Sequence, residues 1–314
     1  MSRVLPLVCA PGYPFAHAWH AALQAAMPAE RVVLLESLGT EERKACEVAI
    51  VANPDPADLR TLPNLQWVHS VWAGVERLVA DLQDSPVQIV RLVDPQLADT
   101  MAEAVLAWTL YLHRDMPRYA RQQAQGQWLA HDYAPPRRKA VALLGLGELG
   151  LASAARLRAA GFEVSGWSRS RKAVADVQCF AGAAELPALL AGADILVCLL
   201  PLTPETEGML GATALGQLRP GASLINFARG AIIDDQALRA ALDAGHLNHA
   251  VLDVFREEPL PAGRWQWQHP QVTVLPHISA PTDRGTASAI VAANIFRFRQ
   301  SGAMPAVVDK QRRY

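Results

Sequence analysis

Short apolar runs of strand length alternate with longer stretches of helical or turn character near the start of the chain. Four such runs lie in the first quarter, at residues 4–10, 31–35, 48–53 and 65–71. Strands that are almost continuously apolar are typical of parallel sheets, in which helices cover both faces. The pattern therefore predicts a small parallel α/β unit over about residues 4–89.

The same alternation returns after residue 138 and continues almost to the end of the chain. Apolar runs lie at residues 139–145, 162–168, 193–200, 222–227, 249–255 and 271–276. They are separated by stretches of helical character, such as residues 237–246. Strand–helix alternation of this kind predicts a doubly wound parallel sheet of the Rossmann type.

A long helix is predicted between these two regions. Thr100 and Glu103 have the spacing of a capping box at its N-terminus. Apolar residues then recur at helical spacing, from Met101 to Leu112. This stripe is broad, so we expect the helix over about 100–120 to be buried between domains or subunits. Residues 131–139 form a connector, and a last helix is expected over 282–300.

Composition and charge exclude several classes of protein. A length of 314 residues suits two domains, and a net charge of -1 provides no basis for a nucleic-acid or membrane partner. The four cysteines have neither disulfide-like nor metal-ligand spacing, so we expect no metal and a cytoplasmic location. The first apolar run is short and contains Pro6, which favours a strand over a signal peptide.

The glycine run GLGELG follows the apolar run at 139–145 and precedes a helical stretch. In this context the motif predicts a dinucleotide site. Gly145 allows the tight turn, Gly147 lets the backbone approach a pyrophosphate, and Gly150 lets helix and strand pack closely. Glu148 and Leu149 lie at the helix N-terminus, whose N–H groups and partial positive charge face the phosphates.

The next predicted strand ends without the acid that would bind the ribose hydroxyls of NAD. Ser168, Arg169, Ser170, Arg171 and Lys172 stand there instead. Neutral and cationic groups accommodate the 2′-phosphate of NADP, onto which an arginine can fork. We therefore predict NADP(H) as the preferred cofactor, with NAD(H) possible. Arg169 is the first candidate for the phosphate contact, and Arg171 and Lys172 could share or replace its role.

Five ordered segments carry a resemblance to a known family: the glycine run, LLPLTPETEGM, NFARGAIIDD, LDVFREEPLP and VTVLPHISAPT. Together they resemble the D-isomer-specific 2-hydroxyacid dehydrogenases, in order and spacing over about residues 140–282. The basic strand end, WAGVE at 72–76 and the ending VVDKQRRY resemble the glyoxylate/hydroxypyruvate reductase A branch. This second resemblance extends over nearly the whole chain.

The family resemblance implies a catalytic set of three residues. Arg229 would bind the substrate carboxylate, His277 would donate the proton to the carbonyl oxygen, and Glu258 would hydrogen-bond that imidazole. The chemistry requires these residue types, because reducing a 2-keto acid needs a cation for the carboxylate and an acid that works near neutral pH. Asp253, by the same resemblance, would contact the nicotinamide carboxamide.

WAGVE corresponds by resemblance to a loop whose backbone N–H groups, near Ala73 and Gly74, meet the substrate carboxylate. Trp72 stands where many relatives have a smaller residue. It could pack within the domain, or it could line the crevice and restrict the pocket to small acids such as glyoxylate. Some relatives carry an aromatic residue just before a proline of this domain, where this chain has Ala52-Asn53-Pro54. This difference leaves the substrate preference open.

Taken together, these features predict a two-domain oxidoreductase that reduces glyoxylate or hydroxypyruvate with NADPH. A smaller flavodoxin-like substrate domain is expected over 1–98, completed by 283–314, with the dinucleotide-binding domain over 99–282. The partners expected are a small 2-keto or 2-hydroxy acid and, as the family resemblance implies, a second copy in a homodimer. The alternatives are a dehydrogenase of larger hydroxy acids and a nucleotide-sensing protein without turnover.

Overall fold

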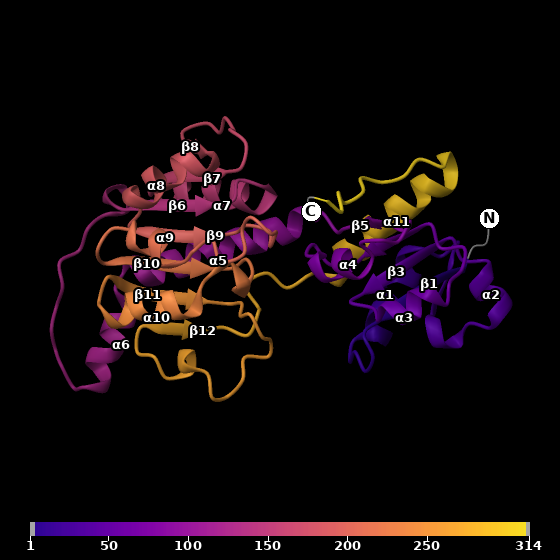
Figure 1. Cartoon of the computed structure of the whole chain (residues 1–314), viewed down its shortest axis with the longest axis horizontal. Helices are drawn as coiled ribbons and strands as arrows, with labels where there is room; N and C mark the ends of the chain where they lie inside the picture. The colour runs from indigo at the N-terminus through magenta and orange to yellow at the C-terminus, as the bar shows by residue number, and fades with distance from the viewer. Residues whose placement is uncertain (1–3, 312–314) are drawn as a thin grey trace. The chain divides into compact units, whose positions relative to one another are not determined.

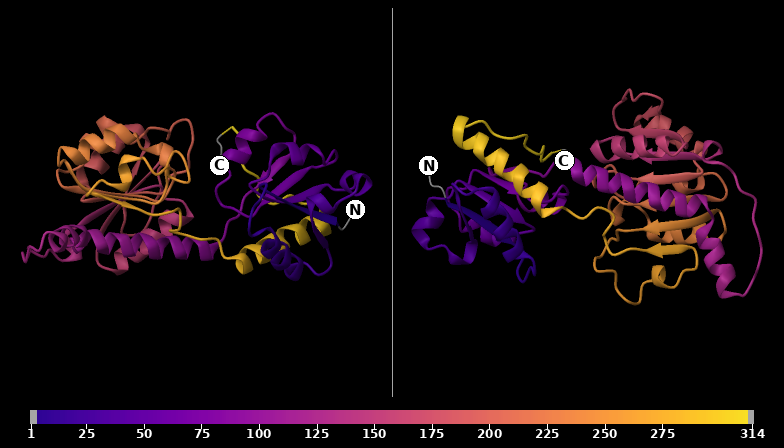
Figure 2. Two further views of the ribbon diagram at one scale, coloured as in Figure 1. Left: turned by 90° about the horizontal axis from the view of Figure 1, so that it is seen from below. Right: turned by 180° about the vertical axis from the view of Figure 1, so that it is seen from behind.

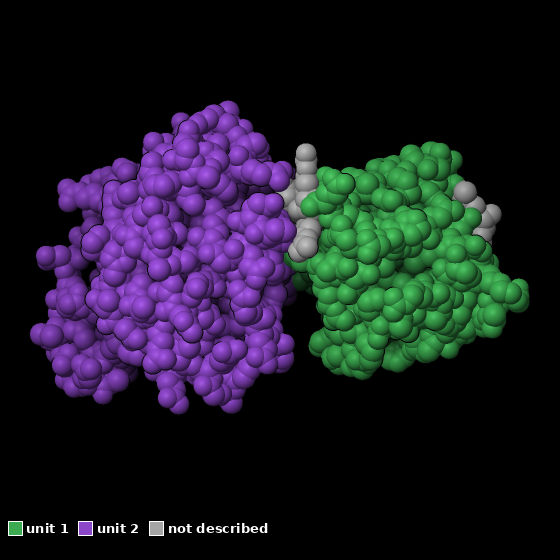
Figure 3. All heavy atoms as spheres, viewed as in Figure 1, with its two compact units in different colours: residues 1–96, 282–314 green, residues 97–281 purple. Residues whose placement is uncertain are grey.

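The structure, a computed structural model, describes residues 4–311, so the last three residues of the VVDKQRRY ending lie outside the described part. The chain divides into two compact units (Figure 3). The first unit comprises Met1–Gln96 and Thr282–Tyr314, and the second comprises Leu97–Pro281. None of the helices in the described part combines the length and apolar character that a membrane crossing requires.

The first unit, drawn mainly in indigo with α11 in yellow (Figure 1), contains a parallel sheet. The strand order of this sheet, over the described residues, is β2-β1-β3-β4-β5. This is the strand order of flavodoxin-like folds, so the predicted fold of this unit is confirmed. Its strands are β1 Val4–Cys9, β2 Arg31–Leu34, β3 Val48–Ala52, β4 Trp67–Ser70 and β5 Gln88–Val90. Its helices are α1 Ala16–Ala26, α2 Thr40–Lys44, α3 Pro56–Arg60, α4 Glu76–Asp81 and α11 Arg284–Ser301.

Helices cover both faces of this sheet, which explains why its strands are mostly apolar. α1 and α11 lie side by side on one face (Figure 2). Trp19 of α1 and Val291 of α11 belong to the same buried cluster as Leu7 of β1. Leu59 of α3 and Val79 of α4 pack in a second cluster on the other face. The C-terminal helix is therefore part of the core of the first unit.

The second unit contains a parallel sheet with the order β12-β11-β10-β9-β6-β7-β8 over the described residues. This order reverses between β6 and β9, as in a Rossmann fold, so the predicted doubly wound sheet is confirmed. Its strands are β6 Ala140–Leu144, β7 Glu163–Ser168, β8 Gln178–Ala181, β9 Ile195–Cys198, β10 Ala222–Asn226, β11 Leu247–Leu252 and β12 Val272–Val274. Its helices are α5 Pro95–His113, α6 Met116–Ala124, α7 Glu148–Ala159, α8 Gly182–Gly192, α9 Ala212–Gly216 and α10 Asp235–Asp243.

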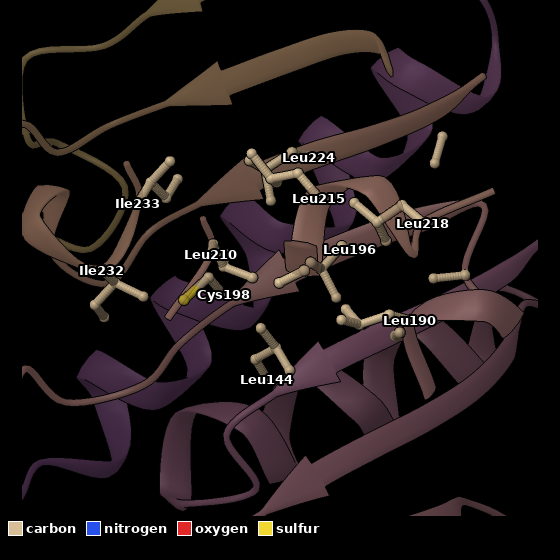
Figure 4. Packing of buried hydrophobic residues seen from close by; sticks show 14 of the residues in the cluster. Leu144, Leu190, Leu196, Cys198, Leu210, Leu215, Leu218, Leu224, Ile232 and Ile233 are labelled. Atoms are coloured by element: carbon tan, nitrogen blue, oxygen red, sulfur yellow. The ribbon is translucent and has the colours of Figure 1, made fainter. Parts of the chain in front are cut away.

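Two buried clusters fill the two faces of this larger sheet. Leu144, Leu196 and Leu224 of the strands meet Leu190 of α8 and Leu215 of α9 on one face (Figure 4). Residues of α5 and α7 pack against the opposite face. Because both faces are covered, polar groups that serve chemistry are confined to the ends of the strands.

The predicted N-terminus of the long helix is wrong. α5 begins at Pro95, so Thr100 and Glu103 lie inside the helix. The carboxylate of Asp94 accepts a hydrogen bond from the backbone N–H of Gln96, at 2.9 Å. Proline at the first helical position needs no partner for an N–H, and the preceding aspartate supplies the acceptor that begins the helix.

The same helix ends sooner than the pattern predicts. α5 stops at His113, and Asp115 adopts a left-handed conformation with φ of +53° before α6 begins. Pro117 lies in the first turn of α6, where it is tolerated, but it could not continue the preceding helix. The helix predicted over 100–120 is therefore divided into two helices, and its apolar stripe from Met101 to Leu112 lies entirely in α5.

Candidate active site

The glycine turn connects β6 to α7 at the point where the strand order reverses. Gly145 has a φ of +106°, which favours glycine, and the turn brings α7 very close to the strand end. A Cβ on Gly150 would lie 1.9 Å from the carbonyl oxygen of Gly145. Only a residue without a side chain allows this approach, so the predicted packing role of Gly150 is present in the structure.

The N-terminus of α7 has the features that a dinucleotide pyrophosphate requires. α7 begins at Glu148, and no side chain caps it at Gly147. The first N–H groups of a helix have no intrahelical acceptor and carry partial positive charge. A Cβ on Gly147 would meet no other atom within 4 Å, so the space in front of the turn is open to a ligand. These residues fit the phosphates of a dinucleotide.

The basic strand end lies beside the glycine turn. The hydroxyl of Ser168, the last residue of β7, donates to the carbonyl oxygen of Ser170 at 2.8 Å. Lys172 reaches back to the turn, where its Nζ donates to the carbonyl oxygen of Leu146 at 2.6 Å. The cation of Lys172 is thus held next to the residues that would bind the pyrophosphate.

Arg171 is directed elsewhere by its contacts. Its guanidinium forms an ion pair with Glu185 of α8 and donates to the carbonyl oxygen of Cys179 at 3.0 Å. The cluster of cations predicted at 169–172 is therefore divided, with Lys172 at the glycine turn and Arg171 against β8 and α8. This division distinguishes two residues that the sequence treats as equivalent.

Glu258 and His277 form the central pair of the second unit. Glu258 follows β11 and His277 follows β12, which are neighbouring parallel strands. Oε2 of Glu258 lies 2.8 Å from Nδ1 of His277, and Oε1 accepts the backbone N–H of Phe255 at 2.8 Å. The second bond fixes the carboxylate, and the carboxylate in turn orients the imidazole so that Nε2 can face a substrate.

The electrostatics of this pair favour a charged imidazole. The hydrogen bond to Glu258 raises the pKa of His277 against the effect of burial, and the charge of Glu258 adds to the increase. Burial acts to raise the pKa of Glu258, but hydrogen bonds from His277 and from the N–H of Phe255 hold it below its ordinary value. His277 thus remains protonated to a higher pH than an isolated histidine, as a proton donor requires.

Arg229 follows β10, the strand next to β11. Its Nη1 donates to the carbonyl oxygen of Ala228 at 2.6 Å. Its charge lowers the pKa values of both Glu258 and His277, although it is not the main cause of either shift. Arg229, Glu258 and His277 therefore gather at the carboxyl ends of three adjacent strands, as the parallel sheet predicts.

Asp253 is buried directly after β11, with 2% of its surface exposed. Its carboxylate accepts the backbone N–H groups of Ile278 and Ser279, at 2.8 and 2.9 Å. Asp253 therefore binds the loop that carries His277, a contact that sequence reasoning did not predict.

In the first unit, the loop after β4 carries the residues predicted to bind substrate. Trp72 packs edge-to-face on Trp19, with ring centroids 5.5 Å apart, and on Tyr13 at 6.3 Å. Within residues 4–311, the backbone N–H groups of Ala73 and Gly74 have no acceptor in the protein. They are thus available to an anion at the carboxyl edge of the sheet, while Trp72 is anchored by packing.

A family model for the NAD binding domain of D-isomer specific 2-hydroxyacid dehydrogenases matches residues 106–279, more than half of the chain. The chain belongs to this family. The match includes the glycine turn, the basic strand end, Arg229, Glu258 and His277. The predicted family and the predicted dinucleotide cofactor are both confirmed.

Individual members of the family are similar over the whole chain. Glyoxylate/hydroxypyruvate reductase A of Serratia proteamaculans (strain 568) is 37% identical over 306 residues, which cover 95% of this chain and 96% of that protein. A family structure from Xanthobacter autotrophicus Py2, in complex with NADPH and MES, is 38% identical with a TM-score of 0.93 and covers 100% of both chains. The NADPH-dependent glyoxylate/hydroxypyruvate reductase of Sinorhizobium meliloti, in complex with NADP and sulfate, is 32% identical with a TM-score of 0.91 and full coverage of both chains. The predicted resemblance to the reductase A branch is confirmed.

Two residues of the site escaped sequence reasoning. Gly230 is packed against the loop after β11, where a Cβ would lie 2.0 Å from the carbonyl carbon of Phe255. Tyr13, in the loop after β1, contacts Trp72 and accepts a hydrogen bond from Nε1 of Trp19 at 3.3 Å. A glycine directly after Arg229 was a visible signal. The position of Tyr13 depends on where β1 lies in the sheet, and the sequence alone does not reveal that strand order.

Among residues 4–311, no group of three or more histidine, cysteine, aspartate or glutamate side chains is suited to hold a metal ion.

Proposed function

We propose that the chain reduces small 2-keto acids with NADPH, converting glyoxylate to glycolate and hydroxypyruvate to D-glycerate. The observation that carries the proposal is the 2.8 Å contact between Glu258 and His277 at the strand ends next to Arg229. This arrangement provides an oriented proton donor close to a cation for a carboxylate. The names of the reductases from Serratia and Sinorhizobium support these substrates.

The residues of the second unit divide the reaction between them. Arg229 binds the substrate carboxylate through its planar guanidinium and polarises the neighbouring carbonyl. His277 donates its proton to the carbonyl oxygen, and Glu258 stabilises the protonated imidazole and keeps it oriented. NADPH, held by the glycine turn and the basic strand end, would supply the hydride for the carbonyl carbon. The product is the 2-hydroxy acid, and the imidazole is left neutral.

Cofactor binding is assigned to the glycine turn and the basic strand end. Gly145, Gly147, Glu148, Leu149 and Gly150 would hold the pyrophosphate through the turn and the N-terminus of α7. The 2′-phosphate would contact the set Ser168, Arg169, Ser170 and Lys172. The contact between Lys172 and the carbonyl of Leu146 supports this assignment, because it brings a cation to the turn.

Substrate binding in the first unit is assigned to the loop of Trp72, Ala73 and Gly74. Open N–H groups at Ala73 and Gly74 support a carboxylate contact, and the bulk of Trp72 supports a preference for small acids. The first unit would thus act as the substrate domain, and the second as the dinucleotide-binding domain.

A second copy of the chain is the expected partner in a homodimer. Large apolar side chains are exposed on α6 and the connector that follows it, including Trp128 at 100%, Leu129 at 58% and Tyr133 at 61% of their surface. Several exposed apolar side chains on one segment support a protein interface there. Light scattering should give the mass of a dimer, and Trp128→Asp should shift it toward the monomer. A monomeric mass at all concentrations would contradict the proposal.

A cytoplasmic location is proposed from the thiols. Cys9, Cys46, Cys179 and Cys198 are all free, which suits a reducing compartment. Alkylation of the freshly isolated, denatured protein, with the alkylated cysteines counted by mass spectrometry, should find four reduced thiols.

The test is nicotinamide oxidation, followed by absorbance, with glyoxylate, hydroxypyruvate and pyruvate in parallel. Faster turnover of the first two acids with NADPH than with NADH is the expected result. Preference for NADH would contradict the cofactor assignment, but the proposed reduction of 2-keto acids would still hold. Turnover of larger acids alone would indicate a different dehydrogenase, and tight NADPH binding without any turnover would indicate a sensing protein.

A further inference from the structure

The carboxylate of Asp253 is committed to one short loop. Each of its two oxygens accepts a backbone N–H, Oδ1 from Ile278 at 2.8 Å and Oδ2 from Ser279 at 2.9 Å. Its own N–H donates to the carbonyl oxygen of Asn226 in β10, at 3.1 Å. With 2% of its surface exposed, Asp253 is fixed between β10 and the loop after β12.

That loop contains an unusual backbone conformation at the proposed proton donor. His277 has a φ of +54°, in the left-handed region that non-glycine residues seldom adopt. Such a conformation persists only when surrounding contacts maintain it. The two hydrogen bonds that Asp253 accepts hold the peptide groups immediately after His277. They therefore restrain the turn that orients the side chain of His277.

We propose that Asp253 is a positioning residue, which acts through the N–H groups of Ile278 and Ser279 to hold His277 in its left-handed turn. This inference rests on the proposed function of His277 as proton donor. It differs from the nicotinamide contact that the family resemblance implies for Asp253. Both oxygens face the loop and almost no surface is exposed, which favours the positioning role.

The charges around His277 give this role a second measurable consequence. Glu258, Arg229 and Asp253 are the charged groups that act on its imidazole. The carboxylates of Glu258 and Asp253 raise its pKa, whereas the guanidinium of Arg229 lowers it. Loss of the charge at Asp253 therefore affects both the direction of the ring and the pH at which it loses its proton.

Asp253→Asn is the decisive variant, since it keeps the size of the side chain but replaces one of the two acceptor oxygens with an NH2 group, which cannot accept a backbone N–H. We expect kcat to fall by about 10²-fold, the scale of an ångström-sized misplacement of a catalytic group. The alkaline limb of the pH profile should move to lower pH, while the Kd for NADPH stays within about twofold of its original value.

Asp194→Asn is the matched control. Asp194 also accepts a backbone N–H, from Ala140 at 2.8 Å. However, Asp194 directly precedes β9, so it lies at the amino ends of the strands, opposite the proposed site. Its variant should leave kcat and the pH profile unchanged. If Asp253→Asn is recovered unfolded, Asp253→Glu takes its place, because it keeps the charge and displaces the oxygens. It should lower kcat with a smaller change in the pH profile.

Two measurements without substrate separate this inference from the proposed function. NMR titration of labelled histidine reports the pKa of His277, and hydrogen exchange reports the protection of the Ile278 and Ser279 amides. We expect a lower pKa and faster exchange in Asp253→Asn. Unchanged values together with weaker NADPH binding would overturn the positioning role in favour of a direct cofactor contact. Failure of the unaltered protein to reduce any keto acid would instead overturn the proposed function.

Discussion

Gly230 and Phe255 lie so close together that a Cβ on Gly230 would come within 2.0 Å of the carbonyl carbon of Phe255. Gly230 directly follows Arg229, and the N–H of Phe255 donates to Glu258. The close approach therefore joins the loop that carries the proposed carboxylate-binding cation to the loop that orients the proposed proton donor. The spacing of the proposed catalytic groups therefore depends on a residue with no side chain.

Gly230→Ala should separate these two loops. We expect a loss of about 1–3 kcal/mol in the free energy of unfolding, as for an overpacked core, and a fall in kcat of at least about tenfold. Steady-state kinetics and urea denaturation measure both effects. The control is Gly216→Ala at the end of α9, where a Cβ would meet nothing within 4 Å. Unaltered kcat in Gly230→Ala would mean that the loops are not rigidly coupled.

Glu258→Gln should change the pH dependence of reduction. If His277 donates the proton, the rate of the unaltered protein should fall as pH rises through the pKa of His277, which Glu258 raises. The amide removes that effect, so the alkaline limb of kcat/KM should move to lower pH and kcat should decrease by about 10²-fold. Glu257→Gln is the control, since Glu257 pairs with Arg264 and not with His277. An unmoved alkaline limb would assign that limb to another group.

The strands and the glycine turn were predictable because their signals are local. Each apolar run that the sequence predicts as a strand is a strand in the structure. Parallel pairing of these strands brings Arg229, Glu258 and His277 to their carboxyl ends. β8 was not predicted, because the apolar run in its four residues Gln178–Ala181 is only three residues long. It exists through pairing with β7, and that pairing is not visible in its own sequence.

Two other features were not predicted, one because a local signal was overlooked and one because it depends on contacts between distant segments. Asp94 and Pro95 determine the start of α5, and the competing capping signal at Thr100 has no effect once the helix begins earlier. The ion pair of Arg171 with Glu185 joins the segment after β7 to α8, which only the fold brings together. A list of cations along the chain therefore could not show which of them remains at the glycine turn.

Arg169→Ala and Arg171→Ala should differ in cofactor selectivity. A charge-assisted hydrogen bond to phosphate is worth about 1.5–3 kcal/mol, so the ratio of kcat/KM for NADPH to that for NADH should fall by about 10–100-fold in Arg169→Ala. Arg171 is paired with Glu185, and its variant should change the ratio by less than about threefold. Equal losses in the two variants would show that Arg171 also reaches the phosphate.

Trp72→Leu should separate packing from selectivity. Trp72 makes edge-to-face contacts with Trp19 and Tyr13, each worth about 1 kcal/mol, so the variant should be about 2 kcal/mol less stable. If the ring also limits the pocket, kcat/KM for larger 2-keto acids should rise relative to glyoxylate. Trp267→Leu is the control, since that ring is half-exposed in the second unit. A loss of stability with unchanged selectivity would make Trp72 a packing residue alone.

His69 should make the stability of the first unit depend on pH. Its ring is fully buried, with Nδ1 2.9 Å from the carbonyl oxygen of Ser70 and Nε2 2.9 Å from Nδ2 of Asn294. A neutral ring donates through Nδ1 and accepts at Nε2, whereas a charged ring would present a second N–H to the amide of Asn294. Burial lowers the pKa of His69 to about 4, so the folded ring remains neutral well below pH 6.5.

The unfolded chain binds this proton more readily, since an unperturbed histidine has a pKa of about 6.5. The contribution of His69 to stability is therefore complete above pH 6.5 and decreases as pH falls toward 4. The decrease from pH 7.5 to pH 5 should be about 2 kcal/mol. Urea denaturation at both pH values should show a smaller decrease in His69→Gln, whereas His17→Gln at an exposed position of α1 should behave as the unaltered protein. His249, whose pKa is also lowered to about 4 by burial, accounts for part of the dependence that remains. The same decrease in His69→Gln as in the unaltered protein would place the acid sensitivity at other groups.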